Sequence, residues 1–261
     1  MHMRRRIGIF LLGMTAMLIT PAGAQDNDAQ SIAPGLDIVG FNGRGLFFGI
    51  EQFGLRHPPG GKPLAQLMDA PAKSSMVPYS EIRIYDLRTD EEIHRSPFVL
   101  DLKRKIPDGV TIGQALRRAR DENYLAARRV IRYLTLVPRG KAFQPASKAA
   151  QKTMFIAAPG LSGGLSVKTF SLKSKDCPGI ETKGYELTLS TSKGDIVIHK
   201  DKVLPRPRGC PVDYSIARAV VYLPHPDMDS LAVVIAAHQG GKPGGRVRYT
   251  VAGHVFDRRK K

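Results

Sequence analysis

The chain has 261 residues, of which 42% are hydrophobic and 24% charged, and it carries a formal net charge of +17 at pH 7. This length suits one large domain or two small ones. The sequence contains no tryptophan and only 7% aromatic residues. No basic stretch alternates with aromatic residues as a base-stacking surface would, so the composition argues against nucleic-acid binding.

The first segment, residues 1–24, has the three parts of a secretory signal peptide. The basic run Arg4 to Arg6 is followed by an uncharged, mostly apolar run, and Ala22-Gly23-Ala24 supplies the small residues of a cleavage site. We therefore predict cleavage between Ala24 and Gln25 and export of the remainder. An uncleaved anchor is the alternative. The apolar run is shorter than the ~20 residues that a transmembrane helix needs, so no transmembrane span is expected in the mature chain.

Removal of the signal segment leaves 37 of the 40 basic residues against all 23 acidic residues, a net charge of +14. Such a balance favours anionic partners. In an exported protein these are an anionic envelope polymer, an anionic glycan or a lipid surface. The alternative is that the excess positive charge only solvates the surface. The sequence indicates no cofactor and leaves the oligomeric state open.

We expect residues 25–35 to form a flexible leader and residues 36–142 to form an N-terminal α+β domain. Near its start, apolar runs flank Asn42-Gly43, which is typical of a β-hairpin. The segment Gly54–Pro78 is rich in Pro, Gly, Lys and Ala. It is expected to be a long exposed loop.

The next stretch alternates at Ile82 and Ile84, which predicts a strand. A turn at residues 88–91 leads to another short strand, expected around Phe98 to Leu102. With the preceding hairpin, this stretch resembles one blade of a β-propeller. A single blade cannot close a propeller, so the expectation is one blade-like antiparallel sheet.

Residues 111–134 carry the one convincing helical pattern. Thr111 and Gln114 make a capping box, and apolar residues recur at helical spacing up to Leu134. Arginines occupy the other faces: Arg117, Arg118, Arg120, Arg128, Arg129 and Arg132. Such an amphipathic helix can lie on an anionic membrane or pack on its own domain with a solvated basic face. We favour packing, because the apolar stripe is narrow and rich in alanine.

After a linker expected at Phe143–Lys152, short strands alternate with turns. This pattern predicts a C-terminal β-sandwich over residues 153–257, or a partly open barrel. A frayed basic tail is expected at residues 258–261. The expected strands are Met154–Ala157, Leu165–Leu172, Tyr185–Thr191, Asp195–His199, Tyr214–Leu223, Leu231–His238 and Val247–Phe256.

Cys177 and Cys210 are the only cysteines. Export would place them where disulfides persist, so we expect one bond joining two long loops of the C-terminal domain. Closing a loop of about 34 residues is worth about 3–4 kcal/mol in the chain-entropy treatment. Two buried free thiols or a metal pair are the alternatives. The absence of a CxxC spacing argues against a thiol oxidoreductase.

Two patterns bear on catalysis. Gly160-Leu161-Ser162-Gly163-Gly164 matches the G-x-S-x-G pattern of hydrolases, but that motif requires a helix after the serine. A strand-like stretch follows instead, so we interpret it as a glycine-rich turn. The six histidines after residue 24 show no local zinc spacing, and convergence of the strand residues His199, His238 and His254 is an open alternative. The six are His57, His94, His199, His225, His238 and His254.

Four sequence features together suggest a family. They are Gly40-Phe41 followed by Gly45, Tyr79-Ser80-Glu81-Ile82 leading to Tyr85-Asp86-Leu87, the helix after Thr111, and Gly209-Cys210-Pro211 followed by Asp213-Tyr214. With them, most of the mature chain resembles the bacterial predicted secreted protein family catalogued as domain of unknown function 2259. The resemblance implies an exported envelope protein with no established activity. It supplies no catalytic residues.

The sequence therefore predicts an α+β, mostly β protein with an N-terminal blade-like antiparallel sheet, one amphipathic helix and a C-terminal β-sandwich. We expect a periplasmic or secreted, non-enzymatic binding or interaction protein that recognises an anionic or carbohydrate envelope component. No catalytic, cofactor-binding or metal-binding residue is assigned. The alternative is an envelope hydrolase whose site is assembled only in the fold, from residues such as Asp86, Asp213 or His225.

Overall fold

The structure is a computed structural model that describes residues 34–56, 64–73, 76–100, 109–146, 151–240 and 246–260. The predicted signal peptide lies outside the described residues. So do the predicted cleavage site between Ala24 and Gln25 and residues 25–33 of the predicted leader.

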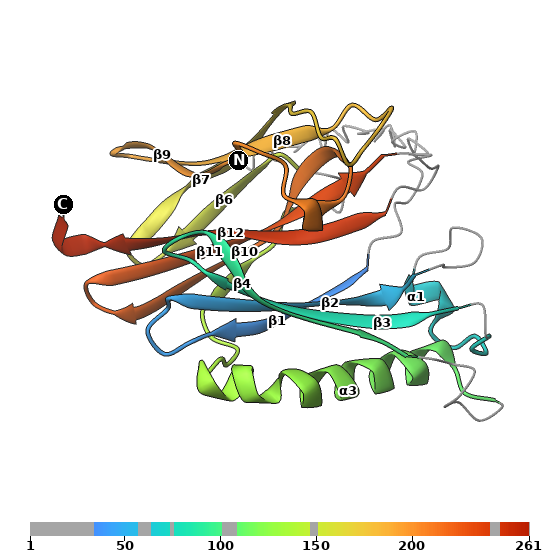
Figure 1. The fold of residues 1–261 in the computed structure, drawn as a ribbon. Helices are drawn as coiled ribbons and strands as arrows, with labels where there is room; N and C mark the ends of the chain where they lie inside the picture. The colour runs from blue at the N-terminus through green and yellow to red at the C-terminus, as the bar shows by residue number, and fades with distance from the viewer. Residues whose placement is uncertain are drawn as a thin grey trace, which may run out of the picture.

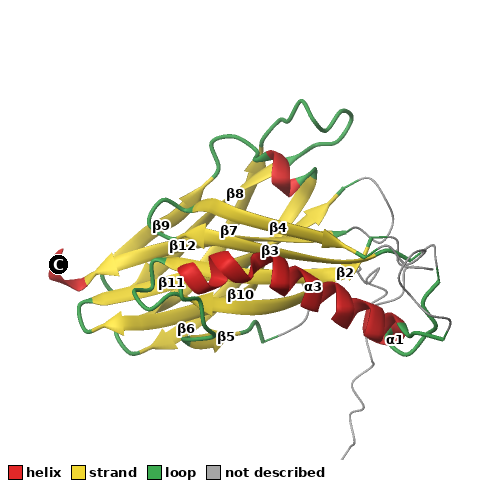
Figure 2. Cartoon of the chain, turned by 60° about the horizontal axis from the view of Figure 1, so that its bottom comes forward, coloured by secondary structure: helices red, strands yellow, loops and turns green. Residues whose placement is uncertain are grey.

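The described chain folds into three four-stranded antiparallel sheets and one long helix, arranged in layers (Figure 1). The N-terminal sheet has the order β1-β2-β3-β4, the middle sheet β12-β11-β10-β5 and the outer sheet β6-β7-β8-β9. The middle sheet packs against both others, and helix α3 covers the remaining face of the N-terminal sheet (Figure 2). The predicted α+β, mostly β fold class is confirmed.

The elements have the following bounds. The strands are β1 Gly35–Phe41, β2 Phe47–Leu55, β3 Pro78–Asp86, β4 Glu91–Val99, β5 Lys141–Phe143, β6 Thr153–Ala158, β7 Leu161–Ser171, β8 Lys183–Thr191, β9 Gly194–Lys200, β10 Pro211–His225, β11 Met228–Gln239 and β12 Val247–Asp257. The helices are α1 Leu64–Leu67, α3 Ile112–Tyr133 and the 3-10 turns η2 Arg206–Arg208 and η3 Arg258–Lys260.

The predicted hairpin at Asn42-Gly43 joins β1 to β2. The Asn42 side chain accepts hydrogen bonds from the backbone N–H groups of Leu46 (2.8 Å) and Phe47 (3.1 Å). Gly45 has a φ of 70°, a left-handed conformation that glycine adopts without a Cβ clash. Asn42 and Gly45 therefore shape a loop longer than a two-residue turn.

The strand expected around Phe98 to Leu102 was predicted in the wrong place. β4 begins directly after the β3–β4 turn and ends at Val99, while residues 101 and 102 lie outside the described residues. β4 is an edge strand, and its first residues are charged, which discourages edge-to-edge pairing. These charges removed the apolar alternation by which the start of the strand would have been recognised.

The segment Gly54–Pro78 was expected to be a long exposed loop, and this is only partly correct. β2 continues to Leu55, and the short helix α1 lies within the segment. Leu67 and Met76 are buried in one cluster with Ile112 of α3. The described part of this segment therefore covers the N-terminal end of α3.

Helix α3 has the predicted capping box. The Thr111 side chain accepts a hydrogen bond from the backbone N–H of Gln114, and Gln114 Oε1 accepts one from the backbone N–H of Thr111 (2.9 Å). Its buried face carries the small side chains Ala115, Ala119 and Ala127. Small residues allow the helix axis to lie close to the N-terminal sheet.

A buried polar network fixes α3 on the sheet. Arg120, expected on a face away from the apolar stripe, turns inward and donates to both carboxylate oxygens of Glu51 at 2.8–3.1 Å. Glu51 is fully buried and also accepts from the Ser80 hydroxyl at 2.8 Å. Ser80 in turn accepts from the amide of Asn123 (2.8 Å). Because each buried group needs its partner, the network specifies one position of the helix on the sheet.

Strand β11 is buried on both faces. Successive side chains of a strand point to opposite faces. Leu231, Val233 and Ile235 face the outer sheet, whereas Ala232 and Val234 face the N-terminal sheet. The near-continuous apolar sequence of β11 is what a strand between two cores requires.

All seven predicted C-terminal strands are present as β6 to β12. The middle and outer sheets pack face to face around one apolar cluster, which is the predicted sandwich. β5 adds residues to the edge of the middle sheet, so the linker expected at Phe143–Lys152 begins inside a strand. Arg258 forms an ion pair with the buried Asp229 (2.6 Å), so the tail expected to fray is held at its first residue.

The division into domains at residues 36–142 and 153–257 stays a prediction. The N-terminal and middle sheets share an apolar cluster that includes Phe41 and Tyr249. Arg83 donates to the backbone carbonyl of Tyr249 (2.7 Å), and the backbone N–H of Tyr249 donates to Gln52 (2.8 Å). The two parts are therefore joined by a continuous core.

The double burial of β11 predicts a large cost for truncation. Ile235→Ala removes a fully buried side chain and should lower the free energy of unfolding by about 2–5 kcal/mol, measured by urea denaturation. Val197→Ala is the control, since Val197 is 54% exposed on β9. Equal effects of the two substitutions would contradict the placement of β11.

Candidate functional site

A pocket of about 320 Å³ lies at one end of the outer sheet. Two connections form it: residues 172–176 after β7 and residues 202–206 after β9. Antiparallel pairing brings the end of β7, the start of β8 and the end of β9 to the same end of the sheet. The pocket is lined by Leu172, Lys173, Ser174, Lys175, Asp176, Lys202, Val203, Leu204 and Arg206.

The pocket has a positive rim and an apolar part. Four basic side chains and one carboxylate line it, so its formal charge is +3. The carboxylate, Asp176, lies 3.3 Å from Arg206, and both side chains are largely exposed. An exposed pair of this kind is weak and screened by salt. We call this set of residues the basic pocket.

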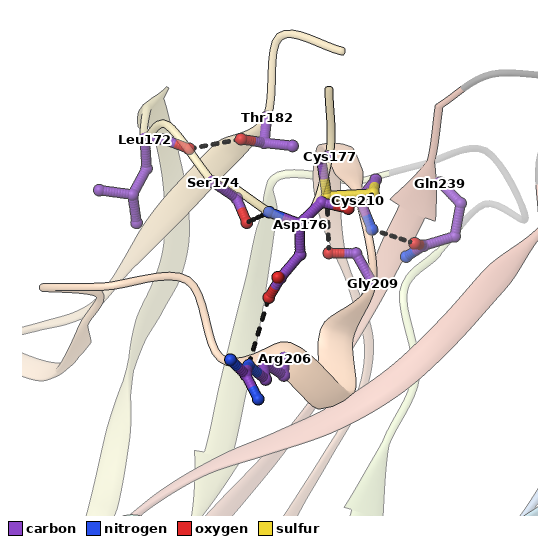
Figure 3. Close-up of a disulfide and its surroundings, with 9 residues drawn as sticks. All are labelled: Leu172, Ser174, Asp176, Cys177, Thr182, Arg206, Gly209, Cys210 and Gln239. Carbon is purple, nitrogen blue, oxygen red and sulfur yellow. Dashed lines mark hydrogen bonds and ion pairs between the residues drawn. A yellow bond between two sulfur atoms is a disulfide. The ribbon is translucent and has the colours of Figure 1, made fainter. Parts of the chain in front are cut away.

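A disulfide between Cys177 and Cys210 ties the two connections together (Figure 3). The predicted pairing is confirmed. Cys177 is buried. The backbone N–H of Cys210 donates to the side-chain oxygen of Gln239 on β11 (2.9 Å). The disulfide therefore anchors the pocket loops to the middle sheet as well as to each other.

A buried ion pair closes the base of the second connection. Arg208 Nη1 donates to both carboxylate oxygens of Asp201, at 2.6 and 2.7 Å, and both residues are buried. Asp201 also accepts from the backbone N–H of Tyr185 (2.9 Å). Since Asp201 and Arg208 stand at the two ends of the 202–206 segment, this pair holds that segment as a closed loop.

His199 lies between two carboxylates. Its Nε2 is 2.8 Å from Asp201, and its Nδ1 pairs with Asp90 of the β3–β4 turn. Asp90 also accepts from the backbone N–H of Gly253 on β12 (2.9 Å). One histidine and one aspartate thus link turns and strands of all three sheets.

Both ring nitrogens of His199 face carboxylates, so the cationic ring, with two N–H donors, fits this site. Burial opposes the charge of His199, but the hydrogen bonds to Asp201 and Asp90 outweigh it and raise the pKa of this histidine. Burial likewise opposes the charge of Asp201, and the hydrogen bond to His199 with the positive charge of Arg208 lowers its pKa. Both ring nitrogens of His199 are thus engaged by carboxylates of the fold itself.

The family of predicted secreted proteins known as domain of unknown function 2259 matches residues 72–253. The chain belongs to this family. The matched residues include both cysteines and every residue of the basic pocket, but not the Gly40-Phe41 hairpin. No curated protein and no solved structure matches the chain.

Two of the residues named for the hydrolase alternative, Asp213 and His225, lie far apart in the structure. The Asp86 carboxylate forms an ion pair with Arg88, with 2.5 Å between Oδ2 and Nη2. Asp213 and His225 stand near opposite ends of β10, which at ~3.3 Å per residue places them about 40 Å apart. Only Gly160 of the G-x-S-x-G match lies in the β6–β7 turn; Leu161 to Gly164 already belong to β7 and pair with β6. The predicted glycine-rich turn is therefore wrong in extent, and the serine is followed by a strand and not by the helix that the motif requires.

The histidines left open as a metal site are only partly close. His199 pairs with Asp90, and Gly253, the neighbour of His254, donates its backbone N–H to the same carboxylate. His238 instead pairs with Ser215 (2.8 Å), near the other end of β11. In the part of the chain that the structure describes, no group of three or more His, Cys, Asp and Glu side chains is arranged to hold a metal ion. His57 lies outside the described residues.

No helix among the described residues combines the length and the apolar character needed to cross a membrane.

The raised pKa of His199 predicts a pH dependence of stability. A cation stabilised in the folded state contributes fully below the ordinary histidine pKa of ~6.5, and its contribution is lost as the pH rises through the folded-state pKa. Burial lowers the pKa of His238 and His254, so their effect lies below ~6.5 and has the opposite sign.

The free energy of unfolding of the unsubstituted protein should therefore fall from pH 6.5 to pH 9 more steeply than that of His199→Asn. Denaturant melts at several pH values measure the two slopes. Parallel slopes in this range would show that His199 is not cationic in the fold.

The disulfide predicts a second effect on stability. Cys177→Ser combined with Cys210→Ser opens a link of sequence separation 33 and should cost about 3–4 kcal/mol. The unsubstituted protein in reducing agent should show the same loss by denaturant melts. A much smaller loss would mean that the pocket loops are held without the bond.

Proposed function

We propose that this secreted protein is a non-enzymatic binding protein of the bacterial envelope, residing in the periplasm, and that the basic pocket binds an acidic sugar unit of an envelope polymer. The observation that supports this most is the pocket itself, with four basic side chains, one carboxylate and apolar residues between them. The disulfide fits an oxidising compartment.

The composition of the pocket suits such a ligand. Lys173, Lys202 and Arg206 offer charge-assisted hydrogen bonds to carboxylate or phosphate oxygens. Leu172 and Val203, in the same lining, offer apolar surface for the C–H face of a sugar ring. The volume of about 320 Å³ lies at the lower end of the ~300–1,000 Å³ of small-ligand sites. One acidic sugar residue of a longer chain is therefore the ligand class that we infer.

The fixed loops also support binding. The disulfide and the Asp201–Arg208 pair hold both pocket connections at their bases. A preorganised site loses less conformational entropy when it binds. The basic side chains remain exposed at the rim, where they attract an anionic polymer from solution.

The experiment is a titration with oligogalacturonate, a sugar polymer that carries one carboxylate per ring. We expect binding that weakens as salt increases, and no binding of neutral dextran. Lys202→Glu should weaken oligogalacturonate binding by at least about five-fold, since one basic residue near an anionic surface is worth about 1 kcal/mol.

Lys193→Glu is the matched control, because it makes the same charge change in the β8–β9 turn, at the far end of the outer sheet. Screening over ~8 Å at physiological salt should leave its affinity within about two-fold. Equal losses in both variants would indicate a non-specific effect of net charge, and no loss in either would refute the pocket assignment.

A further inference from the structure

We propose that the outer face of α3 docks the protein on the surface of an anionic lipid bilayer. This inference concerns a different layer of the molecule from the basic pocket and does not depend on the proposed sugar binding. The surface consists of Arg117, Leu125, Arg128, Arg129, Arg132 and Tyr133, and we call it the α3 basic face.

The position of α3 makes this face available. The helix forms the outermost layer beneath the N-terminal sheet in Figure 1 and lies in front of the sheets in Figure 2. Its inward side is buried at Ala115, Ala119 and Ala127. The Arg120–Glu51 pair and the buried Asn123 fix its rotation, so the same residues always point outward.

The outward residues combine positive charge with apolar surface. Leu125 is 63% exposed and Tyr133 is 86% exposed. Arg128, Arg129 and Arg132 lie between them in sequence and on the same side of the helix, since residues three, four and seven positions apart share a face. Leucine and tyrosine next to arginines are the residues that lie at a membrane surface, where head groups meet acyl chains.

Helix stability alone does not account for this face. Arg132 in the last turn is favourable for the helix dipole, but Arg117, Arg128 and Arg129 lie outside the first and last turns, where the dipole has little effect. Arg128 and Arg132 stand four positions apart, a spacing at which like charges repel. One exposed acidic residue, Asp121, lies on this side of the helix, four positions from Arg117. From Asn123 to Tyr133 the helix carries three arginines and no acidic residue.

A lipid surface explains the combination better than a polyanion does. An acidic polymer would satisfy the arginines but leave Leu125 and Tyr133 without apolar contacts. At a bilayer the arginines meet the phosphate groups of anionic lipids while the two apolar side chains enter the interface. Charge complementarity and exposed apolar residues therefore point to the same occupant.

The test uses the secreted chain from Gln25, which retains every described residue, and vesicles in which one third of the lipid is phosphatidylglycerol and the rest phosphatidylcholine. Co-sedimentation measures the fraction bound. We expect binding to these vesicles at low salt, its loss at high salt, and none to phosphatidylcholine alone. Equal binding to both lipid compositions would overturn the proposal.

Two triple variants with the same charge change locate the binding surface. Arg128→Gln, Arg129→Gln and Arg132→Gln together should reduce partitioning by about 100-fold, at about five-fold per charge. Lys173→Gln, Lys175→Gln and Lys202→Gln together should leave vesicle binding within a few fold while impairing oligogalacturonate binding. Equal losses of vesicle binding in the two triples would reduce the effect to net charge and refute the α3 basic face.

A single tryptophan reports which side enters the lipid, because the chain has none. Tyr133→Trp should shift its emission to the blue on addition of the anionic vesicles. Phe155→Trp, at a position 68% exposed on the outer sheet, should not shift. A shift only at position 155 would place the membrane contact on another face and overturn the proposal. Circular dichroism of each variant establishes that the fold is retained.

Discussion

The burial of β11 between two cores is the constraint on which the other layers depend. Its odd-numbered apolar residues complete the core of the sandwich. Its even-numbered apolar residues pack in the second core, against the N-terminal sheet. Strands of antiparallel sheets commonly have one buried face and one solvent-exposed face, but both faces of β11 are buried. The N-terminal sheet then needs the middle sheet as much as the outer sheet does. The hydrogen bonds of Arg83 and Gln52 to the backbone of Tyr249 complete that junction with polar contacts inside the interface.

The polar groups in the interior act at two further places. Glu51, Arg120, Ser80 and Asn123 position α3, while His199, Asp90, Asp201 and Arg208 position the turns and the pocket loop. Replacing one partner in such a set leaves a buried charge or donor unsatisfied, which is costly. These sets differ from the apolar core in what they specify, since an apolar core tolerates small shifts, but a bidentate ion pair does not. The two surfaces to which we assign binding both stand on such sets.

The sequence predicted what local patterns encode and missed what distant residues build. Alternation located β6 to β12, and the Thr111–Gln114 capping box located α3, because both signals lie within a few residues of the element. β4 was placed too late since an edge strand carries charges where a buried strand carries apolar residues. The inward orientation of Arg120 was not predicted, because helical spacing alone does not reveal its ion-pair partner, Glu51 on β2. The pairing of His199 with Asp90 spans 109 residues and leaves no local pattern. The cysteine pair was the one long-range contact that composition and compartment could predict, and it alone indicated where the pocket loops meet.

The chain order of the layers has a consequence for how a secreted protein of this kind acquires its structure. The N-terminal sheet and α3 come first, the outer sheet follows, and the three long strands of the middle sheet come last, from Pro211 to Asp257. Until those strands arrive, two apolar sheet faces have nothing to cover them. A chain whose N-terminus emerges first therefore cannot bury these faces until the residues from Pro211 onward have also emerged. During that interval the exposed faces are open to aggregation, which makes assistance by a chaperone on the far side of the membrane valuable for this topology.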